Sequence, residues 1–97
     1  MAEPKVVPGI YRHFKGGMYC VLTTATHTET EEELVVYRSL EDSSKIWIRP
    51  VSMWCEKVFK NGKYVDRFEL IEGHPNAYVM LSVENSRKWR MKYGGSR

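Results

Sequence analysis

The stretch Tyr11-Arg-His-Phe-Lys-Gly-Gly17, followed by Met18-Tyr-Cys-Val-Leu22 and closed by His27-Thr-Glu-Thr-Glu31, decides the fold. Gly16 and Gly17 separate two segments rich in aromatic and β-branched residues, and glycine accepts a positive φ without steric cost. The stretch therefore predicts two antiparallel strands, Ile10–Phe14 and Met18–Thr28, joined by a tight turn. Polar side chains gather at the ends of these strands, where a small β domain would carry a site.

The second of these strands is long and apolar on both faces near its middle. Period-two alternation predicts one shared face for Tyr19, Val21, Thr23, Ala25 and His27. Cys20 and Leu22 then point to the other side. A strand of this length and composition is expected to bend or bulge so that it serves two sides of a small roll.

The remainder of the chain extends the all-β pattern through short apolar segments bounded by turn residues. Expected strands are Leu34–Leu40, Ile46–Arg49, Trp54–Lys60, Lys63–Ile71, Ala77–Val83 and a last one holding Trp89, Met91 and Tyr93. Pro50 ends the fourth strand, 51–53 predicts a single 3₁₀ turn, and Asn61-Gly62 predicts a type I′ hairpin. A short helix from Asn85 would also hold Trp89 and Tyr93 on one side, so strand and helix both stay open for residues 84–93.

These elements predict an all-β fold, a small antiparallel SH3-like barrel or roll with one short 3₁₀ turn and an added C-terminal β-hairpin. The 97 residues provide for one domain. We expect an irregular lead-in over residues 1–9, an SH3-like core over 10–71, and a C-terminal hairpin and tail over 72–97.

Composition narrows the function classes. No apolar run approaches the roughly 20 residues of a membrane helix, and the N-terminus lacks the basic start and apolar centre of a signal peptide, so a cytoplasmic location is expected. Cys20 and Cys55 fall in apolar segments without a Cys-x-x-Cys pair, which is typical of reduced, buried thiols. We expect no cofactor and no metal.

The net charge of +3 is concentrated at the C-terminal end. There the basic residues outnumber one acid, Glu84, and four of them are Arg87, Lys88, Arg90 and Lys92. Cations on one side of a strand could follow a nucleic-acid backbone. An edge strand protected from aggregation by its lysines gives the same pattern and is the commoner cause.

Seven residues are candidates for a binding site. Arg49 lies one alternation from Trp47, and a guanidinium beside an indole suits a carboxylate, a phosphate or a stacked base. The alternative is that Trp47 belongs to the core and Arg49 pairs with Glu56 or with an acid of the 29–33 loop. The other candidates, each of which could equally fill the core or satisfy a backbone group, are Tyr11, His13, His27, Glu29 and Tyr37.

Several motifs recur together in order: Tyr11-Arg-His-Phe-Lys-Gly16, Tyr19-x-Val-Leu22, Ala25-x-His-Thr-Glu-Thr30, Leu34-Val-Val-Tyr37, Trp47-x-Arg-Pro50 and Met53. As a set they closely resemble the small bacterial and phage family known as domain of unknown function 1653, over about residues 10–71. The resemblance implies a compact SH3-like β fold with no assigned activity. Because Trp-x-Arg-Pro is a hallmark of that family, the resemblance favours a site at Arg49. The chain departs from the family pattern at Thr28, Glu41-Asp42, Trp54 and Asp66.

Three hypotheses follow. The first is a non-catalytic binding module for a small anionic ligand or a peptide. The second is nucleic-acid binding through the basic C-terminal strand. The third is a small enzyme that uses His27 and Glu29 for proton transfer, although no nucleophile elbow, phosphate-binding glycine loop or metalloprotease motif is present in the sequence. A homodimer is also expected to be possible, since so small a barrel exposes strand edges.

Overall fold

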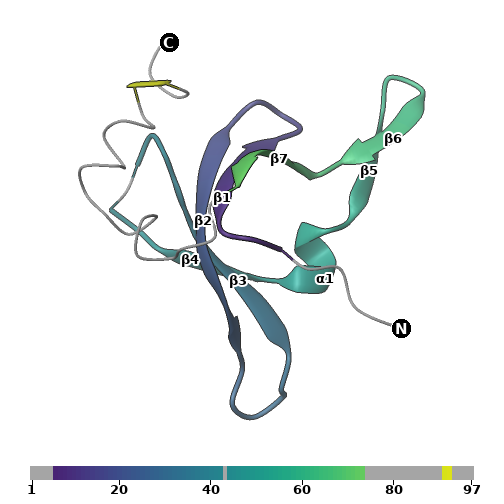
Figure 1. Ribbon diagram of the computed structural model, residues 1–97. Helices are drawn as coiled ribbons and strands as arrows, with labels where there is room; N and C mark the ends of the chain where they lie inside the picture. The colour runs from purple at the N-terminus through teal and green to yellow at the C-terminus, as the bar shows by residue number, and fades with distance from the viewer. Residues whose placement is uncertain (1–5, 43, 74–90, 93–97) are drawn as a thin grey trace.

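The computed structural model describes residues 6–42, 44–73 and 91–92 (Figure 1). In chain order the elements are β1 (Gly9–His13), β2 (Met18–Thr26), β3 (Glu33–Ser39), β4 (Trp47–Pro50), α1 (Val51–Trp54), β5 (Lys57–Lys60), β6 (Lys63–Asp66) and β7 (Phe68–Gly73). All strand pairs among them are antiparallel. The predicted small antiparallel all-β fold is confirmed.

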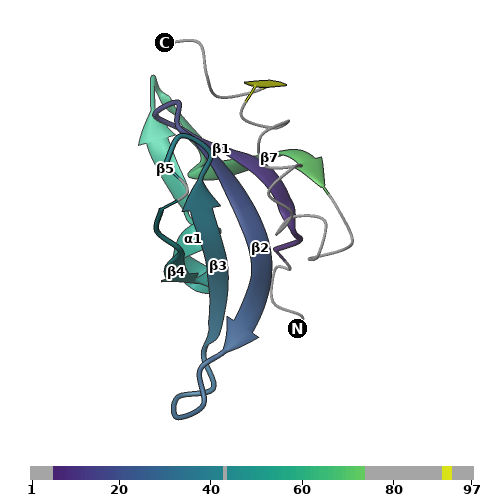
Figure 2. The same cartoon turned by 90° about the vertical axis from the view of Figure 1, so that its left-hand side faces the viewer.

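The strands form one five-stranded sheet in the order β4-β3-β2-β1-β7 and a separate two-stranded hairpin, β5-β6. The sheet is strongly curved, and α1 and the hairpin lie on the same side of it in both views (Figures 1 and 2). Within the described residues the sheet does not close on itself, so of the predicted barrel or roll the structure has an open, curved sheet. The segment from α1 to β6 is inserted in the sequence between the edge strands β4 and β7.

The Gly16-Gly17 turn forms as predicted. The N–H of His13 donates to the carbonyl of Gly17 at 2.7 Å, the N–H of Gly16 donates to the carbonyl of His13 at 2.7 Å, and Gly16 has φ of 108°. A side chain is strained at that φ, which explains why glycine occupies the position.

The predicted bulge in the second strand is also confirmed. Val21 pairs with Tyr37 and Thr23 pairs with Val36, so Leu22 is the extra residue. A bulge reverses the alternation beyond it, and the prediction of one shared face from Tyr19 to His27 is therefore wrong. The strand ends at Thr26, which leaves His27 in the loop that follows.

Two local predictions for the segment from α1 to β7 need correction. Residues 51–54 form an α-helical turn instead of a 3₁₀ turn, because the N–H of Cys55 donates to the carbonyl of Val51 at 3.0 Å, an i to i−4 bond. The strand expected over 63–71 is broken at Arg67, whose N–H donates to Glu56 (3.1 Å) and whose carbonyl accepts from Phe14 (2.9 Å). The type I′ turn is confirmed by the positive φ angles of Asn61 (51°) and Gly62 (83°).

The two faces of the sheet carry separate apolar clusters. The face toward α1 packs its buried residues around an aromatic group that includes Tyr11, Tyr37, Trp54 and Phe68. The other face packs a smaller cluster, which consists of Ile10, Met18, Cys20, Leu22 and Leu40. The first cluster joins the sheet to the arm formed by α1, β5 and β6.

The strand expected over 77–83 and most of the basic C-terminal segment lie outside the described residues. At Met91 and Lys92, which are described, the backbone is helical and not extended. The strand prediction is wrong at these two positions, where the helical alternative applies. Among the described residues, no helix has both the length and the apolar composition that crossing a bilayer requires.

We expect Phe68→Ala to lower the free energy of unfolding by about 3–5 kcal/mol, because the ring is buried and removing it leaves a cavity at the centre of the aromatic cluster. Urea unfolding measures this change. The matched control is Phe59→Ala, since Phe59 is exposed and contributes only a cross-strand contact of less than about 1 kcal/mol. Equal losses in the two variants would contradict the central role of Phe68.

Candidate functional site

Phe68, the first residue of β7, is the centre of a ring cluster on the face of the sheet toward α1. Trp54 stacks on it with a centroid separation of 3.7 Å and an interplanar angle of 3°. His13 (4.9 Å), Tyr19 (5.7 Å) and Tyr37 (6.2 Å) approach it edge-on. Strand register produces this arrangement, because His13 is paired with Phe68, and Tyr19 lies beside Tyr11 on the neighbouring strand.

Arg49 on β4 brings a positive charge to this cluster. Its guanidinium carbon lies 5.9 Å from the centroid of the Phe68 ring, within cation–π range. Its Nε is buried, and no acceptor binds it within the part of the chain that the structure describes. Glu56, the acid that the sequence offered as a partner, instead accepts a hydrogen bond from Arg67 at 3.1 Å.

His13 lies beside Arg49 at the end of β1. Its Nδ1 accepts the backbone N–H of Lys15 at 3.1 Å, which assigns the proton of the neutral imidazole to Nε2. Burial lowers the pKa of His13 below its ordinary value of 6.5, and the positive charges of Arg67, Lys15 and Arg49 lower the pKa further. The imidazole is therefore held neutral near pH 7 as an N–H donor at Nε2.

Two other residues carry a buried N–H donor without an acceptor, as Arg49 does. Nε1 of Trp54 and Nε of Arg67 are buried without a hydrogen-bond partner among the described residues. Buried polar groups are normally paired, so such orphan donors call for an explanation. Every unsatisfied group in this set, which comprises the donors of Arg49, Trp54 and Arg67, is a donor and none is an acceptor. An anion or a carbonyl oxygen could accept hydrogen bonds from these donors.

The arrangement does not suit a metal ion. No group of three or more His, Cys, Asp or Glu side chains with the necessary proximity occurs in residues 6–42, 44–73 and 91–92. The cations around His13 would also oppose a divalent metal.

The structure brings together four of the seven predicted site residues. His13, Tyr37 and Arg49 border the Phe68 cluster, and Tyr11 contacts Trp54 edge-on at 5.4 Å. Tyr11 has a structural role, because its buried hydroxyl donates to the carbonyl of Val7 at 2.8 Å and accepts the N–H of Val7. Burial raises the pKa of Tyr11, so its phenol stays protonated.

Trp47 lies at the margin of the site. It is paired with Tyr37 across the β3–β4 ladder, two residues from Arg49 on the same face of β4. Trp47 is 48% exposed, and the ammonium of Lys45 lies 5.5 Å from its ring centroid. Trp47 is thus accessible to a ligand that extends outward from Arg49.

His27 and Glu29 lie at the opposite end of the molecule, in the loop between β2 and β3 (Figure 1). Nine residues of β2 separate them from the Gly16-Gly17 turn, a span of about 30 Å. Nδ1 of His27 accepts the backbone N–H groups of Glu29 (3.1 Å) and Thr30 (3.3 Å). The imidazole therefore stabilises its own loop, and the structure does not bring this pair to the site of Arg49.

Of the basic residues proposed for nucleic-acid binding, Arg87, Lys88 and Arg90 lie outside the described residues. Lys92 is described, and its ammonium pairs with Glu72 at 3.2 Å.

Sequence reasoning missed Tyr19, Trp54, Arg67 and Phe68 as members of the site. The sequence placed Tyr19 on one face of its strand and Phe68 within the strand expected over 63–71, without marking either as a site residue. Arg67 lies inside a run that reads as one continuous strand, so the sequence carries no local signal for its role. Nothing in the sequence predicts that the indole N–H of Trp54 is left without an acceptor.

The two thiols are unsuited to nucleophilic chemistry. Burial raises the pKa of Cys20 to about 11, and burial also raises the pKa of Cys55. A thiol with a raised pKa carries little thiolate at neutral pH. This agrees with the expectation from sequence that Cys20 and Cys55 are buried, reduced thiols.

Fold and site together define a small antiparallel β domain that carries a donor-rich, cationic site lined by aromatic rings. The family model described as "Protein of unknown function (DUF1653)" matches residues 9–70. The chain is also similar to a crystal structure of a DUF1653 protein from Bordetella bronchiseptica. The TM-score is 0.64 and the identity 35%, and the match covers 75% of this chain and 95% of that one. The chain belongs to the DUF1653 family. No curated protein matches it.

The lowered pKa of His13 predicts a specific pH dependence of stability. Above about pH 6.5 the imidazole is neutral in both states. As the pH falls below this value the unfolded state binds the proton first, so the free energy of unfolding decreases until the pH passes the folded-state pKa of His13. Urea unfolding between about pH 7 and 5 measures how the free energy of unfolding depends on pH. This pH window lies above the range in which ordinary carboxylates titrate.

The His13→Gln variant should lose this part of the slope, whereas a His27→Gln control should keep it. If the stability curves of wild type and His13→Gln run parallel through the window, the assignment of a lowered pKa to His13 is wrong.

Proposed function

We propose that this protein is a non-catalytic binding module that recognises a carboxylate, presented by a small organic anion or by an acidic peptide. The observation that supports the proposal is Arg49, a guanidinium on the Phe68 ring without an acid partner among the described residues. An arginine buried in part and left unpaired is costly, and an anionic ligand would remove that cost.

The chemistry of the neighbouring groups fits a carboxylate. A guanidinium offers a planar fork that binds two oxygen atoms at once, which a lysine ammonium does not. The Nε2–H of neutral His13 supplies a further donor to oxygen. Because the imidazole is neutral, it adds a hydrogen bond without adding a further charge that must be desolvated.

The aromatic surroundings strengthen such an interaction. Stacked and edge-on rings exclude water from one side of the guanidinium, and charge-assisted hydrogen bonds are stronger where water is excluded. Trp47, exposed on the same face of β4, would contact the apolar part of a ligand whose carboxylate is held at Arg49.

The test is an NMR titration of the assigned protein with succinate, inorganic phosphate and a short acidic peptide. We expect a carboxylate to shift the backbone amides near Arg49 and the indole N–H resonance of Trp54. The Arg49→Gln variant should lose these shifts, and Arg49→Lys should weaken binding by about tenfold or more because it retains the charge but not the fork.

The matched control is Arg12→Gln, which removes the same charge at a position where the guanidinium is exposed and paired with Glu69 at 2.8 Å. This variant should bind like the wild type, because exposed ion pairs contribute little. Undiminished shifts in Arg49→Gln, or equal losses in Arg49→Gln and Arg12→Gln, would contradict the proposal.

A further inference from the structure

A hollow lies between the β5–β6 hairpin, the β1–β2 turn and the start of β7. Its volume is about 490 Å³, within the range of about 300–1,000 Å³ that is typical of small-molecule pockets. Strands from distant parts of the sequence contribute to its wall, which includes Arg12, Phe14, Lys60, Lys63, Val65 and Glu69. The hollow is thus large enough for a small organic molecule.

Two lysines face this hollow from one side of the hairpin. Strand alternation places Lys60, Lys63 and Val65 on the same face, and all three line the hollow. The Phe59–Tyr64 pair lies on the opposite face of the hairpin and takes no part in it. Lys60 and Lys63 are direct cross-strand partners, and like charges in that relation destabilise a hairpin. An anion held in the hollow would attract both lysines and offset their repulsion.

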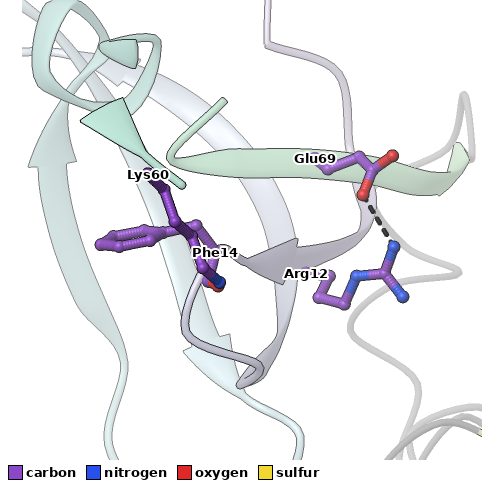
Figure 3. Close-up of polar contacts among 4 residues, drawn as sticks. All are labelled: Arg12, Phe14, Lys60 and Glu69. Atoms are coloured by element: carbon purple, nitrogen blue, oxygen red, sulfur yellow. Dashed lines mark hydrogen bonds and ion pairs between the residues drawn. The ribbon is translucent and has the colours of Figure 1, made fainter. Parts of the chain in front are cut away.

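Neither lysine is neutralised by an acid among the described residues. The ammonium of Lys60 donates to the backbone carbonyl of Phe14 at 2.9 Å and lies 5.9 Å from the centroid of the Phe14 ring (Figure 3). Both of these partners are uncharged. No hydrogen bond or ion pair joins Lys63 to another residue in the part of the chain that the structure describes. Both positive charges are therefore available to a ligand.

The acids near the hollow are engaged by other cations. Glu69 pairs with Arg12 at 2.8 Å on the wall formed by β1 and β7 (Figure 3). Asp66 pairs with Lys57 at 2.6 Å on the other face of the hairpin. Once these two ion pairs are set aside, the hollow retains the two positive charges of Lys60 and Lys63. A ligand with two negative charges is the electrostatic complement.

We propose that the hollow binds a small organic phosphate monoester. A phosphate monoester carries a charge of about −1.5 to −2 at pH 7 and offers three strong acceptor oxygens. Lysine is a common phosphate ligand that acts as a point charge, whereas a carboxylate would neutralise only one of the two lysines. Phe14 and Val65, both half-buried in the wall, provide apolar contact for the organic part of the ligand.

The hollow and the carboxylate site are separate. Arg49 lies on β4, at one edge of the sheet, whereas the hollow is formed against β1 and β7 at the other edge. Neither Lys60 nor Lys63 belongs to the Phe68 cluster. Substitutions at Arg49 and at Lys63 therefore distinguish the two sites.

The test is an NMR titration of the assigned full chain with phenyl phosphate at about pH 7.5, where this ligand is mainly a dianion. The backbone amides of Gly16, Asn61 and Lys63, which border the hollow, should shift. Phenyl sulfate has the same ring and a tetrahedral head group but one charge fewer, and it should bind about tenfold or more weakly. Inorganic phosphate should shift the same amides with lower affinity, because it lacks the apolar group.

The decisive variant is Lys63→Gln, which should weaken phenyl phosphate binding by about tenfold or more because a charge-assisted contact is lost. Lys60→Gln should have a similar effect, and its amide can still donate to the carbonyl of Phe14. Both lysines are exposed, so neither substitution removes a buried side chain. Lys45→Gln is the matched control, since it removes an exposed lysine beside β4 and should bind like the wild type.

Arg49→Gln should also bind phenyl phosphate like the wild type, and Lys63→Gln should keep the shifts that succinate produces near Arg49. Three results would overturn the assignment of a phosphate site: no shifts around the hollow in the wild type, undiminished affinity in Lys63→Gln, or equal affinity for phenyl sulfate and phenyl phosphate. Equal affinity for inorganic phosphate and phenyl phosphate would overturn the organic part of the ligand.

Discussion

The stacking of Trp54 on Phe68 is the contact on which the rest of the structure depends. The described sheet is open, and the rings meet at 3.7 Å where the end of α1 reaches the start of β7. The backbone of Arg67 supports this contact by bonding to both Glu56 and Phe14, which fixes the position of the next residue, Phe68. The placement of Arg49 over the ring follows from that position. Packing and the candidate site are therefore consequences of one aromatic contact.

The features predicted correctly from sequence are those that local chemistry determines. A glycine pair, an Asn-Gly dipeptide and a strand apolar on both faces each predicted the turn or bulge that the structure contains. The strand break at Arg67 depends on hydrogen bonds to Glu56 and Phe14, which are 11 and 53 positions away in the numbering. No local pattern contains that information, and the apolar alternation of the flanking segments favoured one continuous strand.

The residues of the candidate site, like the elements of the fold, were predictable from sequence only in part. Arg49, His13 and Tyr37 could be selected from residue type, and the sheet brings them to one face. By residue type alone His27 and Glu29 were equally suitable candidates, but they lie beyond the far end of β2 and so are separated from Arg49. Trp54 and Arg67 were missed because their distinguishing property is a buried donor without an acceptor. That property exists only once the fold has removed both water and the other possible partners.

His13 connects the two cationic regions of the molecule. Its ring contacts Phe68 in the aromatic cluster, and the same residue lines the hollow between the β1–β2 turn and the hairpin. Arg49 and Arg67 on one side and Lys15 on the other all lower its pKa. An anion bound at Arg49 would oppose these charges and raise the pKa of His13. Since protonated His13 in turn attracts an anion, a carboxylate at Arg49 would bind more tightly at mildly acidic pH than at neutral pH.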